Sequence, residues 1–274
     1  MAPFDQIVTE APAAQRPQRA VGAGRLSLVR GAAGVGPGRL YQQGCAQIRL
    51  PRLRADHAEA ILINTAGGLT GGDMLDWTVE VEAGAAGVVT TQACDKVYRS
   101  SGGVANVTSR LSVGPSARLD WIPQETILFD EARLHRRLEA DVAPDGRLLV
   151  LEAVVLGRAA MGETVRQASL KDRWRIRRGG RLLFADDLVL DGAVSEIAAR
   201  PSLLAGAGAF ASLLLIAPDA ERYLEPLRAA LGAASAWGGR LYARVLAPDG
   251  FALRQALIPA LQALGGPLPR IWTS

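Results

Sequence analysis

Residues 77–82 read Trp-Thr-Val-Glu-Val-Glu, and this alternation decides the fold class. Apolar side chains at every second position lie on one face of an extended chain and the polar ones lie on the other, as in a half-buried β-strand. The same period of two runs through 107–113 and 134–142. Most of the chain up to about residue 216 therefore favours strands over helices.

Turn signals divide these strand patterns at regular intervals. Four glycines, 30, 32 and 34 residues apart, each come before a short strand pattern: Gly84, Gly114, Gly146 and Gly180. Such spacing is typical of stacked hairpins or solenoid-like coils rather than of alternating strands and helices. We therefore expect an all-β-dominated protein, a β-helix-like stack of short strands.

The period changes in the last fifth of the chain. Apolar residues follow helical spacing over 220–231 and 253–264, in each case after an aspartate that can cap a helix and before a glycine that can end it. An alternating stretch at 241–245 predicts one more strand between them. We expect a single domain over 25–274, mainly β to about residue 216, with two helices and an intervening strand at 217–266.

Neither a targeting signal nor a membrane helix is predicted. Residues 1–24 mix proline, arginine, glutamine and alanine without a continuous apolar run, so we expect a flexible N-terminal arm. The uncharged stretch 201–218 is interrupted by proline and glycine. Its apolar part, 210–216, has the length of a buried strand instead.

Composition excludes several classes of protein. A chain of 274 residues can bury a core without disulfides or a structural metal. Its two cysteines, at 45 and 94, form neither a CxxC pair nor a disulfide framework, which fits a reducing cytoplasm. The formal net charge of +4 is spread along the chain, whereas nucleic-acid binding requires clustered charge.

The densest glycine cluster is Gly-Gly-Leu-Thr-Gly-Gly-Asp at 67–73. A phosphate-binding loop needs a helix after it, but here a strand pattern begins at Trp77, and no Gly-Lys-Ser/Thr is present. We interpret the cluster as a tight turn that requires positive φ. A partner surface or a polar passage beside Asp73 is the functional alternative.

Residues 90–100 interrupt the β alternation with many side chains that donate, accept or ligate, and a loop of this composition is often functional. Cys94 can bind a soft or borderline metal there, but a lone cysteine is more often a small buried apolar residue. His57 and His135 are likewise isolated, and His135 falls on the polar face of its strand. The roles of these three residues and of Cys45 stay open.

Residues 121–130 place Glu125 and Asp130 among mostly apolar neighbours, where paired carboxylates can perform acid–base chemistry. A β-solenoid hydrolase acting on carbohydrate is therefore one hypothesis. Only 5% of the residues are aromatic, which argues against a sugar-binding groove. No nucleophile with an evident base is found either.

A basic stripe lies within 171–177. By alternation, Arg173, Arg175 and Arg177 share one strand face, and apolar side chains take the other. An edge strand charged against stray pairing would account for the stripe. Docking to an acidic protein surface is the alternative, and these three arginines are our candidates for partner binding.

Five segments, taken together and in this order, resemble the urease accessory protein family called UreD, or UreH in some organisms. They are 67–73, 90–100, Trp-Ile-Pro-Gln-Glu-Thr-Ile-Leu-Phe-Asp at 121–130, Leu-Gly-Arg-Ala-Ala-Met-Gly-Glu at 156–163 and Pro-Leu-Pro-Arg-Ile-Trp at 267–272. One departure is Ile63-Asn64-Thr65-Ala66, where many family members carry a His-Pro-Pro-type lead-in. A role for a histidine there does not carry over to this chain.

The resemblance implies a β-helix-like body with two helices and a non-catalytic role. Members of the family bind the urease apoprotein and act with UreF, the GTPase UreG and, indirectly, the nickel donor UreE to place nickel in the urease active site. For this chain it implies a cytoplasmic scaffold with nickel in transit, no tightly bound cofactor, and GTP only on the partner GTPase. An internal passage for nickel is a proposed property of the family.

Four carboxylates in the matching segments are our candidates to line such a passage: Asp73, Glu125, Asp130 and Glu163. Oxygen ligands bind a hydrated divalent ion weakly and release it, which suits a conduit. The same carboxylates can instead anchor loops, by accepting backbone hydrogen bonds or pairing with Arg99 and Arg158. The sequence thus predicts a nickel-insertion scaffold that is not an enzyme and has no nucleic-acid or membrane partner. The alternatives are the hydrolase using Glu125 and Asp130, and a protein-binding module unrelated to nickel.

Overall fold

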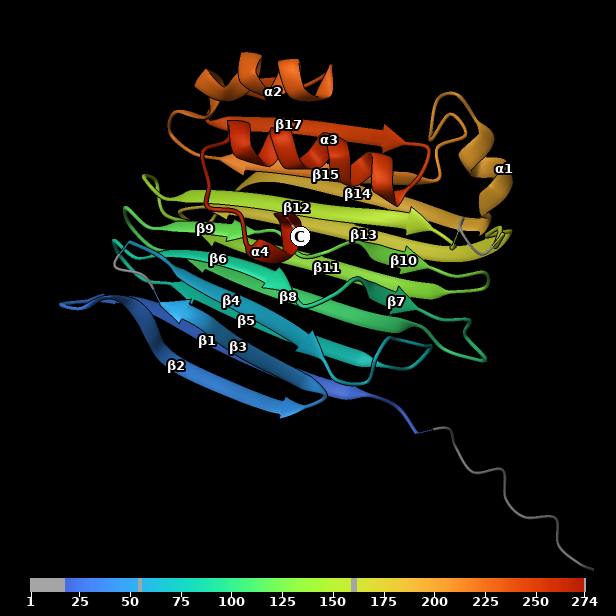
Figure 1. Ribbon diagram of the computed structural model, residues 1–274, viewed down its shortest axis with the longest axis horizontal. Helices are drawn as coiled ribbons and strands as arrows, with labels where there is room; N and C mark the ends of the chain where they lie inside the picture. Colours follow the sequence, from blue (N-terminus) through green and yellow to red (C-terminus); the bar gives the residue numbers. More distant parts are fainter. Residues whose placement is uncertain (1–17, 54–55, 159–161, 274) are drawn as a thin grey trace, which may run out of the picture.

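The computed structural model describes residues 18–53, 56–158 and 162–273, and it contains two β-sheets packed face to face (Figure 1). The first sheet has seven strands in the order β14-β13-β11-β8-β5-β1-β2. Their bounds are β1 Val21–Gly31, β2 Gly34–Gly44, β5 Met74–Val81, β8 Ala105–Val113, β11 Arg133–Val142, β13 Gln167–Arg178 and β14 Arg181–Ala193.

The second sheet has ten strands, eight of them in the order β16-β17-β15-β12-β9-β6-β4-β3; in addition, β10 pairs with β12 and β7 pairs with β10. Their bounds are β3 Ala46–Leu53, β4 Ala58–Asn64, β6 Ala86–Thr91, β7 Asp95–Val97, β9 Arg118–Trp121, β10 Thr126–Leu128, β12 Arg147–Leu156, β15 Ala209–Ile216, β16 Ser235–Trp237 and β17 Arg240–Ala247.

The chain coils between the two sheets. From β4 to β13 it alternates between the second sheet and the first, and the strands of each sheet pair in parallel with those of the next turn of the coil. Antiparallel strands close the stack: β2 and β3 at the start, and β14, β15 and β17 at the end. The predicted β-solenoid-like stack is confirmed.

Alternation in the sequence places the core between the sheets. In β11, buried and accessible side chains strictly alternate, and Leu134, Leu138 and Val142 point inward and are almost fully buried. The stretch that predicted the fold behaves in the same way, because Trp77, Val79 and Val81 are all buried. Burial of one face of each strand fixes its register, since a slip by one residue would expose that whole face.

The two edges at which the chain changes sheet differ in length. Short turns at 82–85, 114–117 and 143–146 lead from the first sheet to the second, and we call this edge the turn end. Longer connections at 65–73, 92–104, 122–132 and 157–166 lead back, and we call that edge the loop end (Figure 1, right). Gly84, Gly114 and Gly146 all lie at the turn end. Gly180 instead lies in the hairpin between β13 and β14 within the first sheet.

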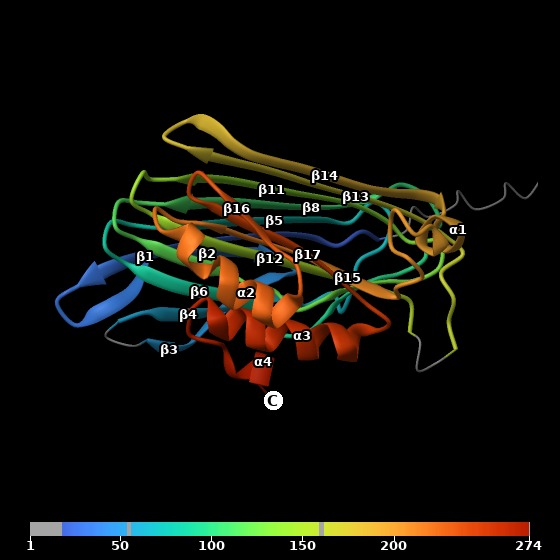
Figure 2. The same ribbon diagram turned by 90° about the horizontal axis from the view of Figure 1, so that it is seen from above.

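The two longer helices cover the outer face of the second sheet (Figure 2). The helix α2 (Leu224–Leu231) and the helix α3 (Gly250–Ala263) pack on its outer face and form a second apolar core with β15 and β17. Both predicted helices are therefore present, as is the strand between them. Asp249 caps α3 by accepting a hydrogen bond from the backbone N–H of Ala252, at 2.8 Å.

The first of these helices differs in detail from the prediction. Residues Ala220–Tyr223 form a 3₁₀ turn, η2, rather than the start of α2, and Asp219 makes no side-chain capping hydrogen bond. Instead, Asp219 pairs with Arg222 at 3.0 Å. Two short helices, α1 (Val194–Ala199) and α4 (Arg270–Thr273), were not predicted, because they are too brief to show a helical period.

The ends of two strands, β1 and β15, fall in or beside stretches interpreted from the sequence. The strand β1 begins at Val21, so the last four residues of the predicted arm at 1–24 are strand; residues 1–17 lie outside the described residues. Residues Ala209–Ile216 form the fully buried strand β15, as predicted. None of the described helices has the length and hydropathy of a membrane-crossing segment.

Candidate functional site

The four connections of the loop end hydrogen-bond to one another in sequence order. Leu69 joins the first two connections through its backbone. Its N–H donates to the Lys96 carbonyl at 2.7 Å, and its carbonyl accepts from Tyr98 N–H at 2.8 Å. Phe129 N–H donates to the Val97 carbonyl, and Gly157 N–H donates to the Leu128 carbonyl. The loops therefore form one connected layer, which includes all of the first four sequence segments.

The glycine cluster is a tight turn, as interpreted. Gly67, Gly68 and Gly72 have positive φ, and a Cβ on Gly68 would overlap the ring of Tyr98. Asp73 is buried and accepts backbone hydrogen bonds from Ala20 N–H at 2.8 Å and Thr70 N–H at 2.7 Å. Its carboxylate holds the turn together.

Asp130 and Glu163 also hold loops. Asp130 accepts from the backbone N–H groups of Arg166 and Gln167 at 2.8 and 2.9 Å, and these bonds hold the pKa of its carboxyl below the usual value. Glu163 accepts from the backbone N–H of Arg158 at 3.2 Å and from its guanidinium at 2.9 Å. The Asp130 N–H lies 3.5 Å from Glu163 Oε1, so these two loops are joined.

Glu125 has a different environment. It is almost fully buried, and Arg254 of α3 donates to its two carboxylate oxygens at 3.1 and 2.9 Å. Burial would raise the pKa of Glu125, but the hydrogen bonds from Arg254 outweigh it, and the pKa is lowered. Arg254 also donates to Gln124 Oε1 and stacks over the ring of Trp272 at 5.0 Å.

Cys94 is the neighbour of this pair. Its thiol lies 3.3 Å from Glu125 Oε2, to which it donates a hydrogen bond. Burial, with the nearby carboxylate, raises the pKa of Cys94 to about 11. The thiol is therefore protonated at neutral pH, and the thiolate form that binds metals and acts as a nucleophile is suppressed.

A cluster of buried charges lies between the sheets beneath the loop end. Arg136 of β11 pairs with Glu152 of β12 at 2.5 Å and with Asp172 of β13 at 2.6 Å. The indole N–H groups of Trp121 and Trp174 donate to the same two carboxylates, at 3.0 and 3.2 Å. The guanidinium also donates to Thr126 Oγ1 at 3.1 Å, but its Nε is buried with no hydrogen-bond partner among the described residues.

A third carboxylate faces the same guanidinium. Asp95 of β7 has its pKa raised by burial to about 6, although the positive charge of Arg136 opposes that shift. Burial likewise raises the pKa of Glu152. Three carboxylates thus share one arginine, and the cluster carries an excess of negative charge when all are ionised.

This cluster borders a small cavity of about 30 Å³, which has room for a water molecule. Its polar lining comes from Thr91, Asp95, Gln124, Thr126, Arg136 and Glu152, together with Ser109. Gln124 also lines an open groove of about 990 Å³ between the loop end and α3. The segment at Gln124 is therefore a common wall of the interior cavity and the outer groove.

The groove is mostly apolar. Ile127, Val155, Leu156 and Ile271 contribute to its surface, and Phe251, at the N-terminus of α3, is 71% exposed beside it. Cys94, Glu125 and Arg254 lie on the same surface. The groove thus connects an apolar surface, suited to a protein partner, with polar groups that lead toward the cavity.

The basic stripe lies on the outer face of the first sheet. The prediction that it is an edge strand is wrong, because β13 pairs with both β11 and β14. Two of its arginines are already paired, since Arg173 and Arg175 contact Asp187 at 3.4 and 2.6 Å. Arg177 is exposed and has no ion pair among the described residues.

The structure does not bring the four predicted carboxylates together. Within the described residues, no group of three or more His, Cys, Asp or Glu side chains is placed to hold a metal ion. Sequence reasoning missed Asp95, Arg136 and Glu152. One signal was available: Arg136 and Glu152 occupy inward positions of strands that are otherwise apolar, where a charge needs a buried partner.

The geometry does not favour the hydrolase. A glycosidase needs one carboxylic acid whose pKa is raised so that it can protonate the leaving group. The pKa values of Glu125 and Asp130 are both lowered, and each is held by an arginine. Neither is poised as a general acid.

Fold and site together define a β-solenoid-like protein with a polar interior and a layer of interlocked loops at one end. The family model described as "UreD urease accessory protein" matches residues 20–273. The chain belongs to this family of urease accessory proteins.

Curated relatives agree along almost the whole length. The urease accessory protein UreD of Agrobacterium fabrum (strain C58) is 52% identical over 264 residues, covering 94% of this chain and 92% of the relative. That of Rhizobium leguminosarum bv. viciae is 51% identical, covering 97% and 99%. The protein of the same name in Chelativorans sp. (strain BNC1) is 51% identical, covering 93% and 95%.

Proposed function

We propose that this chain is a non-catalytic urease maturation factor of the cytoplasm. It acts as an adaptor that binds the urease apoprotein together with UreF and the GTPase UreG, receives nickel supplied through UreE, and supports nickel insertion into urease. Family membership and full-length similarity to proteins named urease accessory protein UreD support the role in urease maturation. The partners and the route of the metal are the parts that this proposal adds.

The observation that carries the nickel route is the polar cavity between the sheets. Most cores of this size are apolar, and burying charge costs free energy unless it is paired. Here Asp95, Glu152 and Asp172 surround one guanidinium, so the cluster holds more negative charge than Arg136 neutralises. A passing divalent cation would compete with Arg136 for the same oxygens, and oxygen ligands allow it to leave again.

Among the carboxylates named from the sequence, Glu125 is the one we retain for the route. It adjoins Gln124, the wall shared by the groove and the cavity, and Arg254 holds both side chains. Asp73, Asp130 and Glu163 accept backbone hydrogen bonds within the loop layer, which supports the anchoring alternative for them. In this proposal nickel enters from the groove, passes Glu125 and reaches Asp95.

Partner binding by the basic stripe is a separate part of the proposal. Arg177 keeps an unpaired charge at the turn end of β13, whereas Arg173 and Arg175 would have to exchange Asp187 for a partner carboxylate. Exchange of one carboxylate for another changes the free energy little at an exposed site. We therefore expect the stripe to contribute specificity rather than affinity.

The first test is urease maturation in a host that carries the urease subunits and the remaining accessory genes, with and without this chain. Omission should leave abundant urease that is poor in nickel and inactive. If urease were fully metallated without the chain, the maturation role would be wrong, and a protein-binding module unrelated to nickel would be the better description.

The second test distinguishes the proposed nickel route through the cavity from the proposed role as an adaptor between proteins. Asp95→Asn removes a cavity charge and keeps the volume, whereas Asp145→Asn makes the same change at an exposed position of the turn end. We expect Asp95→Asn to lower the nickel content of purified urease while the chain still co-purifies with its partners, and Asp145→Asn to change neither. Normal nickel content with Asp95→Asn would remove the route and leave the adaptor intact.

A further inference from the structure

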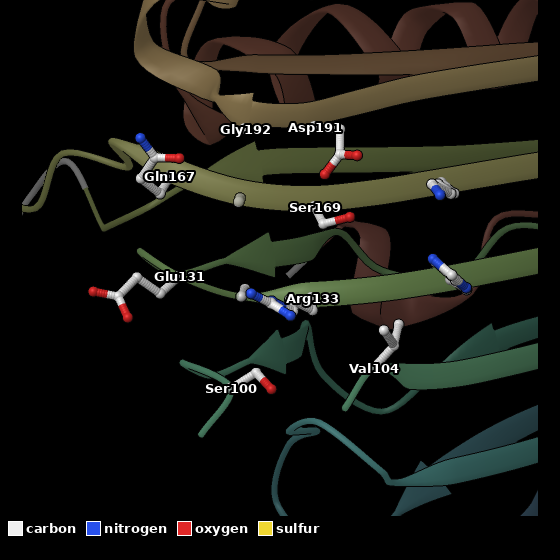
Figure 3. A pocket seen from close by; sticks show the side chains of 12 residues that line it. Ser100, Val104, Glu131, Arg133, Gln167, Ser169, Asp191 and Gly192 are labelled. Carbon is white, nitrogen blue, oxygen red and sulfur yellow. The ribbon is translucent and has the colours of Figure 1, made fainter. Parts of the chain in front are cut away.

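A polar hollow of about 560 Å³ lies on the outer face of the first sheet, next to the loop end (Figure 3). The strands β11, β13 and β14 supply Arg133, His135, Ser169, Lys171 and Asp191 to it. Ser100, Glu131 and Gln167 come from the adjoining loops. No helix covers this face, so the hollow is open to a partner (Figure 2).

Three charged side chains in this hollow have no direct partner. Among the described residues, the side chains of Arg133, Lys171 and Asp191 form no ion pair and no hydrogen bond. Glu131 pairs outward with Arg99 at 2.8 Å, and Figure 3 shows its carboxylate pointing away from Arg133. The other end of the same strands differs, since Asp187 neutralises Arg173 and Arg175 there.

The register sets the spacing of the two free cations. Arg133 lies opposite Ser169, and Lys171 lies opposite His135, so Arg133 and Lys171 are diagonal neighbours on adjacent parallel strands. Such diagonal positions are about 7–8 Å apart. Alternate side chains of an extended peptide lie about 7 Å apart on one face, so two carboxylates in an acid-x-acid sequence match this spacing.

We propose that this hollow binds an extended acidic segment of a partner protein, with carboxylates at alternate positions held by Arg133 and Lys171. Asp191, beside Ser169, limits the acidic stretch on the β14 side and accepts a hydrogen bond from the segment's backbone or from a basic side chain. The inference does not depend on nickel passing through the cavity.

The test is binding of two labelled peptides of equal composition to the full chain at low ionic strength. Ser-Glu-Ser-Glu-Ser presents both carboxylates on one face when extended, whereas Ser-Ser-Glu-Glu-Ser presents them on opposite faces. We expect the first to bind several-fold tighter. Arg133→Gln and Lys171→Gln should each weaken it roughly three- to fivefold, in keeping with exposed charge pairs.

Matched controls lie on strands of the same sheet. Arg137→Gln on β11 and Arg181→Gln on β14 remove exposed arginines outside the hollow and should leave binding unchanged. Thermal unfolding of each variant checks that the fold is intact. Equal binding of the two peptides, equal loss in the control variants, or full competition by inorganic phosphate at the same charge concentration would each overturn the proposal.

Discussion

The turn end and the loop end of the coil join the same two sheets, yet they are built differently. At the turn end, successive turns stack through backbone bonds such as Gly84 N–H to the Pro115 carbonyl at 2.9 Å and Ala143 N–H to the Val113 carbonyl at 2.8 Å. At the loop end, backbone bonds also join the loops, and the carboxylates of Asp73, Asp130 and Glu163 add side-chain bonds to them. The short turns need only to reverse the chain, whereas the long loops specify one particular surface.

The core between the two sheets also differs between the turn end and the loop end. On β11, the inward side chains nearest the turn end are Leu138, Ala140 and Val142, which are wholly apolar, whereas Arg136 lies toward the loop end. Apolar packing needs only matching volumes, but a buried charge needs specific partners. The molecule thus concentrates the interactions that cost stability at the end where the proposed route and the polar hollow lie.

The largest loss of stability is expected from Arg136→Met, which removes the cation of the charge cluster near the loop end. The change leaves Glu152 and Asp172 buried without their cation, and we expect a loss of about 3–5 kcal/mol in the free energy of unfolding. Chemical denaturation measures it. A triple variant that adds Glu152→Gln and Asp172→Asn removes the stranded charges and should recover much of the loss. No recovery would mean that packing, not charge, dominates at the loop end.

The next effect is a pH dependence from Asp95. Its pKa in the folded protein, about 6, lies above the ordinary aspartate value, so the folded state holds a proton that the unfolded state releases first. Stability from this group is therefore present below about pH 4 and is lost as the pH rises through about 6, by up to about 3 kcal/mol. Asp95→Asn should flatten the unfolding free energy over this window. Asp145 accepts hydrogen bonds from Ser116 that lower its pKa, so Asp145→Asn at the turn end should alter the slope only near and below pH 4. Equal slopes in wild type and Asp95→Asn would contradict the assignment.

A smaller effect is expected from glycine substitution in the two kinds of connection. A Cβ on Gly71 would overlap Ser100 Oγ and the carbonyl oxygen of Gly102, and the backbone there cannot yield without breaking the loop layer. At the turn end, a Cβ on Gly146 would lie 3.1 Å from a methyl group of Val142 and 3.2 Å from the Gly114 carbonyl oxygen, which is tight but leaves no overlap like that at Gly71. We expect Gly71→Ala to cost about 1–3 kcal/mol and Gly146→Ala less than about 1 kcal/mol. Thermal unfolding compares them, and equal costs would remove the contrast between the two ends.

The smallest effect is expected on the outer face. Arg173→Gln removes one of two arginines that share Asp187, and the pair is exposed to solvent. Such pairs contribute little to stability. The melting temperature should not change measurably, and a clear drop would show that the stripe supports the sheet rather than a partner.

The fold was predictable because alternation and glycine spacing act locally. The strands around Trp77 and in 134–142, the turns at Gly84, Gly114 and Gly146, and the cap at Asp249 each follow from a few neighbouring residues. The helices α1 and α4 were not predictable in this way, since one turn of helix leaves no period to detect. Nor was the place of β13 within its sheet, because nothing in 171–177 says which strand lies beside it.

The candidate site was predictable only in part. Segment resemblance found the loops, and with them Glu125, but it could not find Arg136, Glu152 and Asp172, which come from three different strands. Their meeting depends on the register between turns of the coil. Asp130 and Glu163 illustrate the opposite case: their residue type suggested ligands, but backbone donors supplied by the loops occupy them.

Parallel stacking of the turns makes the first and last strands of the stack differ in structure. A coil that repeats by translation has two unlike ends along its stacking direction. At one, β14 is joined to β17 through Tyr242 and Arg244, which both contact Asp186. At the other, β2 and β3 have no further strand beside them in the described chain. The strands β14 and β16 are likewise the last of their sheets in the described chain, so strand edges that can pair lie at both ends of the stack, and only at the β14 end do these side-chain contacts brace the two sheets against each other.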